Sequence, residues 1–253
     1  MLAMPAPPAH LRPPARPQPL QHLPRAALAA VIGVMTDIDD TLTRAGAIEP
    51  VALAALHALR EAGVPVVAIT GRPLGWSEPF AGTWPVQAIV AENGAVALVR
   101  DVHGAVHTEY AQDQASRAAN ARRLQAVAQQ VLREVPGARL AQDSAGRVTD
   151  IAIDHSEFTR LPPAAIGQVV ALMQAAGMQA TVSSIHVNGW FGSHNKWSAA
   201  CWMLLRLFGR ELAPEVGRWL YVGDSTNDQL MFGHFPLSVG VANLRDFAAQ
   251  LQV

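Results

Sequence analysis

Two aspartates, one residue apart, follow directly on an apolar run near the start of the chain. They belong to the segment Asp37-Ile38-Asp39-Asp40-Thr41, which comes after the apolar run 31–36. Clustered carboxylates repel one another and lose solvation, and a hard divalent cation among them makes the arrangement tolerable. Mg²⁺ suits it best, because this ion shares one or two carboxylates with a bound phosphate. The pair therefore predicts a magnesium site that handles a phosphorylated ligand.

The same spacing fits nucleophilic chemistry at phosphorus. A carboxylate whose charge is neutralised by a metal can attack a phosphoryl group and form an acyl phosphate. A second carboxylate two residues along then serves as the acid for the leaving alcohol and as the base for the hydrolytic water. Asp37 alone could also cap or solvate the end of a strand, but the second carboxylate at Asp39 favours a functional role.

Further polar groups follow apolar runs later in the chain. Thr70-Gly71-Arg72 comes at the end of the β-branched run 64–70, and Asp224 follows the run 219–222. In an open α/β sheet, ligands bind at the carboxyl ends of the strands, so these groups are expected to share one crevice. There the Thr70 hydroxyl and the Lys196 ammonium would complement the charge of the phosphoryl oxygens.

The order of the predicted elements indicates how these residues are positioned. Strands and helices alternate up to residue 94 and again after residue 196, which predicts a doubly wound, mainly parallel α/β sheet. Between these parts, a long polar helix at 112–135, two strands, a helix at 163–176 and a strand at 178–185 form an inserted α+β block. We predict a core domain at 29–104 and 186–253 and a cap at 105–185.

Five motifs follow one another along the chain. They are Asp37-Ile38-Asp39-Asp40-Thr41-Leu42-Thr43, Ile69-Thr70-Gly71-Arg72, Glu92-Asn93-Gly94-Ala95, Lys196, and Gly223-Asp224-Ser225-Thr226-Asn227-Asp228. In this order they resemble the haloacid dehalogenase-like superfamily, and within it the Cof-type phosphatases with a type IIB cap. The resemblance covers nearly everything from residue 31 to residue 247, and five motifs with the expected spacing are far more specific than any one of them.

The resemblance implies a role for each matched residue. Asp37 becomes the nucleophile and a metal ligand, and Asp39 the acid and base, which also binds the metal through its backbone carbonyl. Relatives that act as ATPases or phosphonate hydrolases usually lack this second carboxylate, so its presence favours ester hydrolysis. The other implied roles are Asp224 as third metal ligand, Asn227 and Asp228 as orienting groups for water or the lysine, and Thr70 and Lys196 as phosphoryl-binding groups. At Asp40, many relatives have glycine instead.

Four residues are candidates for substrate contacts. Arg72 either reaches the substrate or pairs with a carboxylate, and the sequence favours neither. His186 and Asn188 flank the return from the cap to the core, where they either contact substrate or serve as hinge residues. Asn93 belongs to a matched motif. Asp154 and His155 are interpreted as turn residues of the cap.

Composition sets the remaining expectations. A formal net charge of −1 gives no basic surface for nucleic acid or anionic lipid, so a small phosphorylated metabolite is the expected partner. The single cysteine excludes an internal disulfide and fits a cytoplasmic protein. Residues 1–28 are rich in proline and alanine and are predicted to be disordered. The apolar stretch 26–35 is too short to span a membrane. The oligomeric state stays open.

Three functions are compatible with these observations. The first is a Mg²⁺-dependent phosphatase for a small phosphorylated metabolite, such as a sugar phosphate. The second is a phosphomutase that resembles phosphomannomutases in its nucleophile motif, although such enzymes carry a longer, glycine-rich last motif. The third is a protein that binds a phosphometabolite without turning it over, but every carboxylate and the lysine of the motifs are present.

Overall fold

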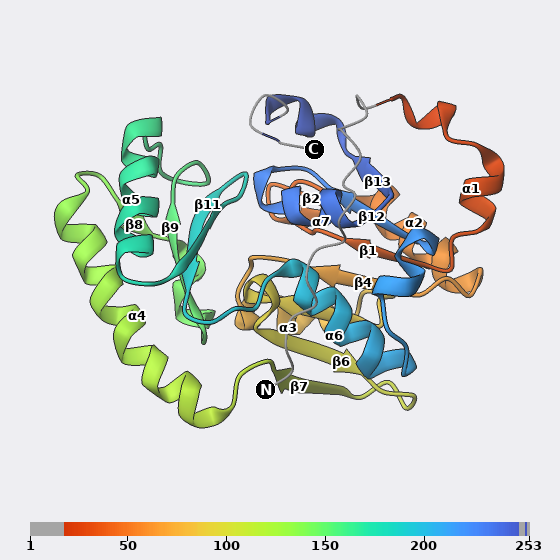
Figure 1. The fold of residues 1–253 in the computed structure, drawn as a ribbon, viewed down its shortest axis with the longest axis horizontal. Helices are drawn as coiled ribbons and strands as arrows, with labels where there is room; N and C mark the ends of the chain where they lie inside the picture. Colours follow the sequence, from red (N-terminus) through yellow and green to blue (C-terminus); the bar gives the residue numbers. More distant parts are fainter. Residues whose placement is uncertain (1–17, 248–250, 252–253) are drawn as a thin grey trace.

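The computed structural model describes residues 18–247 and 251, which form a large sheet with helices on both faces and a smaller sheet beside it (Figure 1). The large sheet has seven strands in the order β13-β12-β1-β4-β5-β6-β7. The first five run parallel, and β6 and β7 are antiparallel additions at one edge. This confirms the predicted doubly wound α/β fold. The strands are β1 (Gly33–Thr36), β4 (Val66–Ile69), β5 (Ala88–Ala91), β6 (Val96–Arg100), β7 (Val106–Tyr110), β12 (Trp219–Gly223) and β13 (Leu237–Gly240).

Two apolar layers hold this sheet between its helices. The central strands β1, β4 and β5 are buried at every position, as expected for strands covered on both faces. One layer joins the sheet to α2 and α3, with Leu56 and Leu74 in its core, and the other joins it to α6 and α7 through Met203 and Met231. The helices are α2 (Pro50–Glu61), α3 (Leu74–Ala81), α6 (Lys196–Phe208) and α7 (Gln229–His234).

The inserted block forms a second, smaller sheet with its own helices, which we refer to as the cap and which lies on the left in Figure 1. Its antiparallel sheet has the order β10-β11-β9-β8, and helices α4 and α5 pack on it through an apolar cluster that includes Val131, Ile153 and Met173. The elements of the cap are α4 (Gln114–Glu134), β8 (Arg139–Leu140), β9 (Asp150–Asp154), α5 (Pro163–Ala175), β10 (Gln179–Val182) and β11 (His186–Trp190).

Both predicted boundaries of the cap at 105–185 differ from the structure. Strand β7 belongs to the large sheet, because it continues the hairpin of β6 with Val96 paired to Tyr110. Strand β11 belongs to the cap sheet, where it lies between β10 and β9. Its residues include histidine, asparagine and glycine, which hide a strand in the sequence, yet all five positions are buried. The cap therefore runs from α4 to the end of β11.

The amino-terminal part also differs from its prediction. Of the extension 1–28 that we predicted to be disordered, residues 1–17 lie outside the described residues. The rest contains a short 3-10 helix and the exposed helix α1 (Arg25–Ala29), which begins directly after Pro24. Alanine has the highest helix propensity, and this explains a helix without a buried face. A small hairpin of β2 (Thr43–Arg44) and β3 (Ala47–Ile48), and helix α7, were not predicted.

The described helices were also compared with the requirements of a membrane span. None of the helices in residues 18–247 combines the length and the apolar character that crossing a bilayer requires.

Candidate active site

The parallel register brings the motif residues to one edge of the large sheet. Thr36 pairs with Val222 on one side and with Ala68 on the other, so that the ends of β12, β1 and β4 lie side by side. The backbone N–H of Asp37 donates a hydrogen bond to the carbonyl of Val222. Asp37 and Asp224, which follow β1 and β12, line one cavity at this edge, as expected from the sequence. Thr70, at the end of β4, contacts Asp39 but does not line the cavity.

Lys196 links two of the acidic residues. Its Nζ donates hydrogen bonds to Oδ1 of Asp37 at 2.5 Å and to Oδ1 of Asp228 at 2.7 Å. The lysine begins helix α6, and Asn195 before it caps that helix with a side-chain hydrogen bond to the N–H of Ser198. This N-cap hydrogen bond of Asn195 fixes the first turn of α6, and the first turn directs the ammonium of Lys196 toward the sheet edge.

Asp228 lies behind the site as a support. Its carboxylate accepts hydrogen bonds from Lys196, from the phenol of Tyr221 and from the backbone N–H groups of Asp224 and Ser225. With its oxygens shared among these donors, Asp228 orients the lysine and the loop that carries Asp224. Tyr221 was not singled out in the sequence, because an aromatic residue inside an apolar strand is ordinarily part of the core.

The charges of the site are strongly coupled. Burial raises the pKa of Asp37 well above its usual range, although the Lys196 ammonium lowers it in part. Burial, reinforced by the carboxylate of Asp228, raises the pKa of Asp224 to about 7. Burial would lower the pKa of Lys196, but Asp228 and Asp37 outweigh it and raise this pKa above its usual range. The pocket therefore contains more negative charge than one lysine balances, which favours a bound cation.

The donor set fits Mg²⁺. Carboxylate oxygens of Asp37, Asp224 and Asp228 lie within 4.8 Å of one another. Of these three, Asp37 and Asp224 line a cavity together with Asp39, whereas Asp228 does not reach it. Hard oxygen ligands on a rigid sheet edge beside a cavity are the surroundings that Mg²⁺ prefers.

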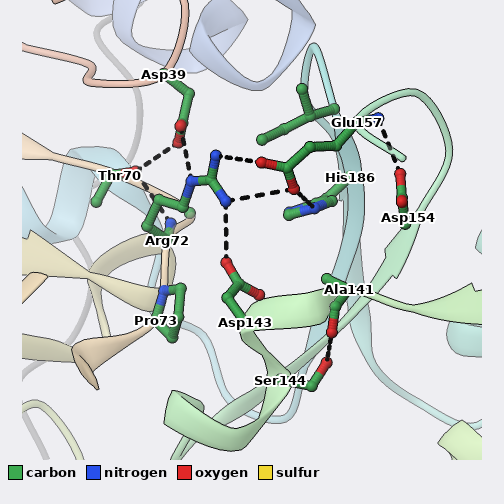
Figure 2. A network of polar contacts seen from close by, with 12 residues as sticks. Asp39, Thr70, Arg72, Pro73, Ala141, Asp143, Ser144, Asp154, Glu157 and His186 are labelled. Atoms are coloured by element: carbon green, nitrogen blue, oxygen red, sulfur yellow. Dashed lines mark hydrogen bonds and ion pairs between the residues drawn. The ribbon is translucent and has the colours of Figure 1, made fainter. Parts of the chain in front are cut away.

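Asp39 is held by two groups of the neighbouring strand end. The hydroxyl of Thr70 donates a hydrogen bond to Oδ2 at 3.3 Å, and Nε of Arg72 donates one to Oδ1 at 2.7 Å (Figure 2). The backbone N–H of Arg72 in turn donates to the Thr70 hydroxyl at 3.0 Å. Both oxygens of this carboxylate are thus oriented by the segment Thr70-Gly71-Arg72.

Of the four candidates for substrate contacts, two line the cavity and two do not. His186 and Asn188 of β11 line the cavity, and three residues of the preceding turn, Ser183 to Ile185, line it too. Arg72 pairs with three carboxylates, one of the two roles considered for it, and does not line the cavity. Asn93 is buried beside Gly71 and does not line the cavity. The cavity is lined by Asp37, Asp39, Gly71, Ser183, Ser184, Ile185, His186, Asn188, Asp224, Ser225 and Asn227.

Asp40 has an unusual backbone conformation. Its φ of 53° lies in the left-handed region, where glycine is free of the steric penalty of a Cβ and aspartate is among the tolerated residues. The backbone at this position is therefore one that favours glycine and that aspartate also adopts.

The structure adds residues that the sequence analysis missed. Glu157 and Asp143 of the cap contact Arg72, and the amide of Asn243 donates a hydrogen bond to Asp224 at 2.8 Å. Glu92, known only as part of a motif, is fully buried and accepts hydrogen bonds from the backbone of Val148 and Thr149 in the cap. Local patterns could not reveal these contacts, since each joins distant parts of the chain.

One compositional signal was available for the lysine. Among the 19 lysine and arginine residues of the chain, Lys196 is the only lysine. Where arginine serves every other cationic position, the exception indicates a site that a guanidinium does not fit.

Comparisons with known proteins agree with this geometry. Residues 34–129 match the sequence family described as haloacid dehalogenase-like hydrolase. No curated protein matches the chain at a significant level. A structure from Thermoplasma acidophilum is similar with a TM-score of 0.63 at 16% identity, covering 85% of this chain and 88% of that one.

Two enzymes are also similar in structure. The sucrose-phosphatase of Synechocystis, solved with sucrose and phosphate, has a TM-score of 0.58 at 18% identity, covering 84% of this chain and 83% of its own. The IMP-nucleotidase of Plasmodium falciparum has a TM-score of 0.59 at 10% identity, covering 85% of this chain and 67% of its own. At these identities, the likeness concerns the fold.

Proposed function

We propose that this chain, a haloacid dehalogenase-like hydrolase by its match over residues 34–129, is a Mg²⁺-dependent phosphatase of a small phosphorylated metabolite. One observation carries the proposal. Asp37 ends a buried strand in a cavity that it shares with Asp39 and Asp224, and the ammonium of Lys196 lies 2.5 Å from its carboxylate. The proposed nucleophile and the proposed acid and base thereby face one small cavity, and the cation contacts the nucleophile without itself lining that cavity.

The first half of the reaction uses Asp37 and Asp39. A carboxylate oxygen of Asp37 attacks phosphorus, and the bond between phosphorus and the ester oxygen breaks as the aspartyl phosphate forms. Asp39 donates a proton to the departing alcohol oxygen. Lys196 and the hydroxyl of Thr70 bind the phosphoryl oxygens, whose charge grows in the transition state.

The second half regenerates the nucleophile. Asp39, now a carboxylate, accepts a proton from a water molecule that attacks the same phosphorus atom, and inorganic phosphate leaves. When bound at Asp37, Asp224 and the backbone carbonyl of Asp39, Mg²⁺ would neutralise the repulsion between the carboxylate nucleophile and the phosphoryl group. Asp228 and Asn227 hold the lysine and the loop around Asp224 in place.

The lining of the cavity favours a hydroxyl-rich leaving group, as in a sugar phosphate. The cap side contributes two serines, His186 and Asn188, all of which exchange hydrogen bonds with hydroxyl groups. The names of the two similar enzymes, sucrose-phosphatase and IMP-nucleotidase, indicate substrates of this kind, in which an alcohol is esterified with phosphate.

Hydrolysis of p-nitrophenyl phosphate tests the proposal. The wild type should release nitrophenol with Mg²⁺ and stop after removal of the metal, and Asp37→Asn should be inactive with the metal present. Asp246→Asn, an exposed aspartate outside the site, is the matched control and should keep full activity. Metal-dependent turnover by Asp37→Asn would reject the nucleophile.

A panel of phosphorylated metabolites identifies the substrate and the reaction type. Release of inorganic phosphate from sugar phosphates, ranked by kcat/KM, is the expected result. An isomerised sugar phosphate without free phosphate would identify a phosphomutase instead. Binding of phosphate esters without any turnover would identify a protein that only binds them.

A further inference from the structure

Arg72 joins the core to the cap through three carboxylates (Figure 2). On the core side, its Nε lies 2.7 Å from Asp39. On the cap side, its terminal nitrogens lie 2.8 Å from Glu157 and 3.2 Å from Asp143. The guanidinium has one fixed plane, so the direction of its Nε depends on where its other nitrogens are held. The orientation of Asp39 is therefore linked to the cap.

Glu157 is itself firmly placed. The carboxylate of Asp154, at the end of β9, accepts hydrogen bonds from the backbone N–H groups of residues 156 to 159 and so fixes the loop that carries Glu157. His186 of β11 contacts Glu157 through Nε2 at 2.9 Å. The interpretation of Asp154 as a turn residue agrees with these contacts, and the turn presents Glu157 toward the core.

The contacts are shielded from solvent, which strengthens them. The side chain of Arg72 is only 5% exposed, and those of Asp143 and Glu157 are 13% and 19% exposed. Asp143 is shared with Arg147, whose nitrogen lies 3.1 Å away. Glu157 is the cap carboxylate with the shorter contact to Arg72, and it meets the guanidinium with both of its oxygens.

We propose that Glu157 is a positioning residue, which holds Arg72 and thereby orients Asp39 for proton transfer to the leaving group when the cap is closed. This inference rests on the proposed function, since it concerns the acid of that reaction. An open cap would leave the guanidinium with Asp39 and the ring of Trp76, 5.2 Å away, and without the two cap carboxylates that hold its terminal nitrogens. Closure over the substrate and alignment of the acid would thus be one event, which limits proton transfer to a site already shielded from water.

The leaving group of the substrate provides a selective test. Aryl phosphates with dinitrophenyl, nitrophenyl and unsubstituted phenyl groups share one ring, and in this order the phenolates leave progressively less well without a proton. The size differences from the nitro groups affect the wild type too, so each variant is compared with the wild type on the same substrate. A misplaced acid therefore slows phenyl phosphate most. For Glu157→Gln we expect kcat/KM to fall by about 10-fold or more on phenyl phosphate and by less than about 3-fold on dinitrophenyl phosphate, a part of the usual contribution of an acid.

Thr149→Val is the matched control. Thr149 also joins the cap to the core, through a hydrogen bond to Glu92, but it does not contact Arg72, Asp39 or Glu157. Its loss weakens cap closure and should lower kcat/KM by the same factor for all three phosphates. Equal factors for Glu157→Gln would overturn the inference, because they would reduce Glu157 to a cap contact.

Arg72→Lys provides a second variant on the same contact. A lysine is a point charge and cannot bind Asp39 and Glu157 with fixed geometry. The activity of Arg72→Lys should therefore depend on the leaving group as the activity of Glu157→Gln does. The double variant should be close to Arg72→Lys alone, since both changes break one linkage. Independent, additive losses would contradict the linkage.

The outcomes for the inference and for the proposed function are distinguishable. If the wild type with Mg²⁺ releases phosphate neither from the aryl phosphates nor from any metabolite of the panel, the proposed function is wrong and the inference is wrong with it. If the wild type is active and Glu157→Gln shows no added dependence on the leaving group, only the inference is wrong. Thermal unfolding of each variant identifies any change that merely prevents folding, and the Arg72→Lys series then decides.

Discussion

The ammonium of Lys196 lies 2.5 Å from the carboxylate of Asp37, although 159 residues separate them in the sequence. The lysine is buried, with 3% of its surface exposed, and its Nζ also donates a hydrogen bond to Asp228 at 2.7 Å. A buried cation between two buried carboxylates is stable only with all three in place, because removal of one leaves the others uncompensated. The position is therefore sensitive to both charge and size.

Substitution by the other basic residue tests this sensitivity. Lys196→Arg keeps the charge but inserts a larger, planar group into a closed space, so we expect kcat to fall by about 10²-fold or more, the cost of a misplaced electrostatic group. Steady-state hydrolysis of p-nitrophenyl phosphate measures the loss. The control is Arg210→Lys in an exposed ion pair with Glu215, which should leave kcat unchanged. A fully active Lys196→Arg would show that charge alone suffices.

Glu92 provides a prediction about the cap. Its buried carboxylate accepts hydrogen bonds from the backbone of Leu74, Val148 and Thr149, and a glutamine has only one acceptor oxygen for them. Glu92→Gln should lower the free energy of unfolding by about 1–3 kcal/mol, the cost of leaving buried donors unpaired. Urea denaturation measures this loss.

Hydrogen exchange locates the effect of the same variant. The amides of Val148 and Thr149 should exchange faster in Glu92→Gln, since they lose their acceptor. Glu134→Gln, an exposed glutamate at the end of α4, should change neither measurement. Unaltered protection of the two amides in Glu92→Gln would mean that the carboxylate does not hold the cap.

The sequence predicted the core of this fold because its strands carry a plain signal. The apolar runs at β1, β4 and β12 and the polar residues that follow them predict Asp37, Thr70 and Asp224 at one sheet edge. The parallel register then brings them together without further information. These interactions are set by local patterns and by the general rules of α/β sheets.

No local sequence pattern indicates the contacts between the core and the cap. Arg72 and Glu157 are 85 residues apart, and a glutamate in a polar loop is ordinarily solvated. Strand β11 was hidden because His186 and Asn188 interrupt its apolar pattern, and both are buried because they face the active site. Polar residues that face a cavity interrupt the apolar pattern by which a buried strand is predicted, so a prediction from this pattern misses such a strand.

The ion pairs of Glu157 predict a dependence of stability on pH. Burial raises the pKa of Glu157, but hydrogen bonds with His186 and Arg72 outweigh burial and lower this pKa from 4.5 to about 2. A lowered pKa stabilises the folded protein above the unfolded value and loses that contribution as pH falls toward the folded value. Wild type should therefore exceed Glu157→Gln in Tm at pH about 6, and the gap should close as pH falls from about 5 to about 2.

Thermal unfolding of both proteins across this pH range measures the gap directly. Glu134→Gln serves again as the control, because its exposed side chain has little influence on stability at any pH. A gap between wild type and Glu157→Gln that stays constant down to pH about 2 would contradict the assignment of an ionised Glu157 in the folded protein.

Asp40 offers a test of backbone conformation at the edge of the site. Its φ of 53° costs an ordinary residue about 1–2 kcal/mol, and glycine avoids this cost but loses about 0.4–1 kcal/mol through the flexibility of the unfolded chain. Asp40→Gly should therefore change the free energy of unfolding by less than about 1 kcal/mol and keep kcat within about 3-fold.

Asp40→Val, with a branched Cβ that resists this conformation, should be less stable by about 1–2 kcal/mol. Urea denaturation and p-nitrophenyl phosphate hydrolysis of the two variants measure these effects. A large loss of kcat in Asp40→Gly, without a change in stability, would instead give the Asp40 carboxylate a part in the reaction.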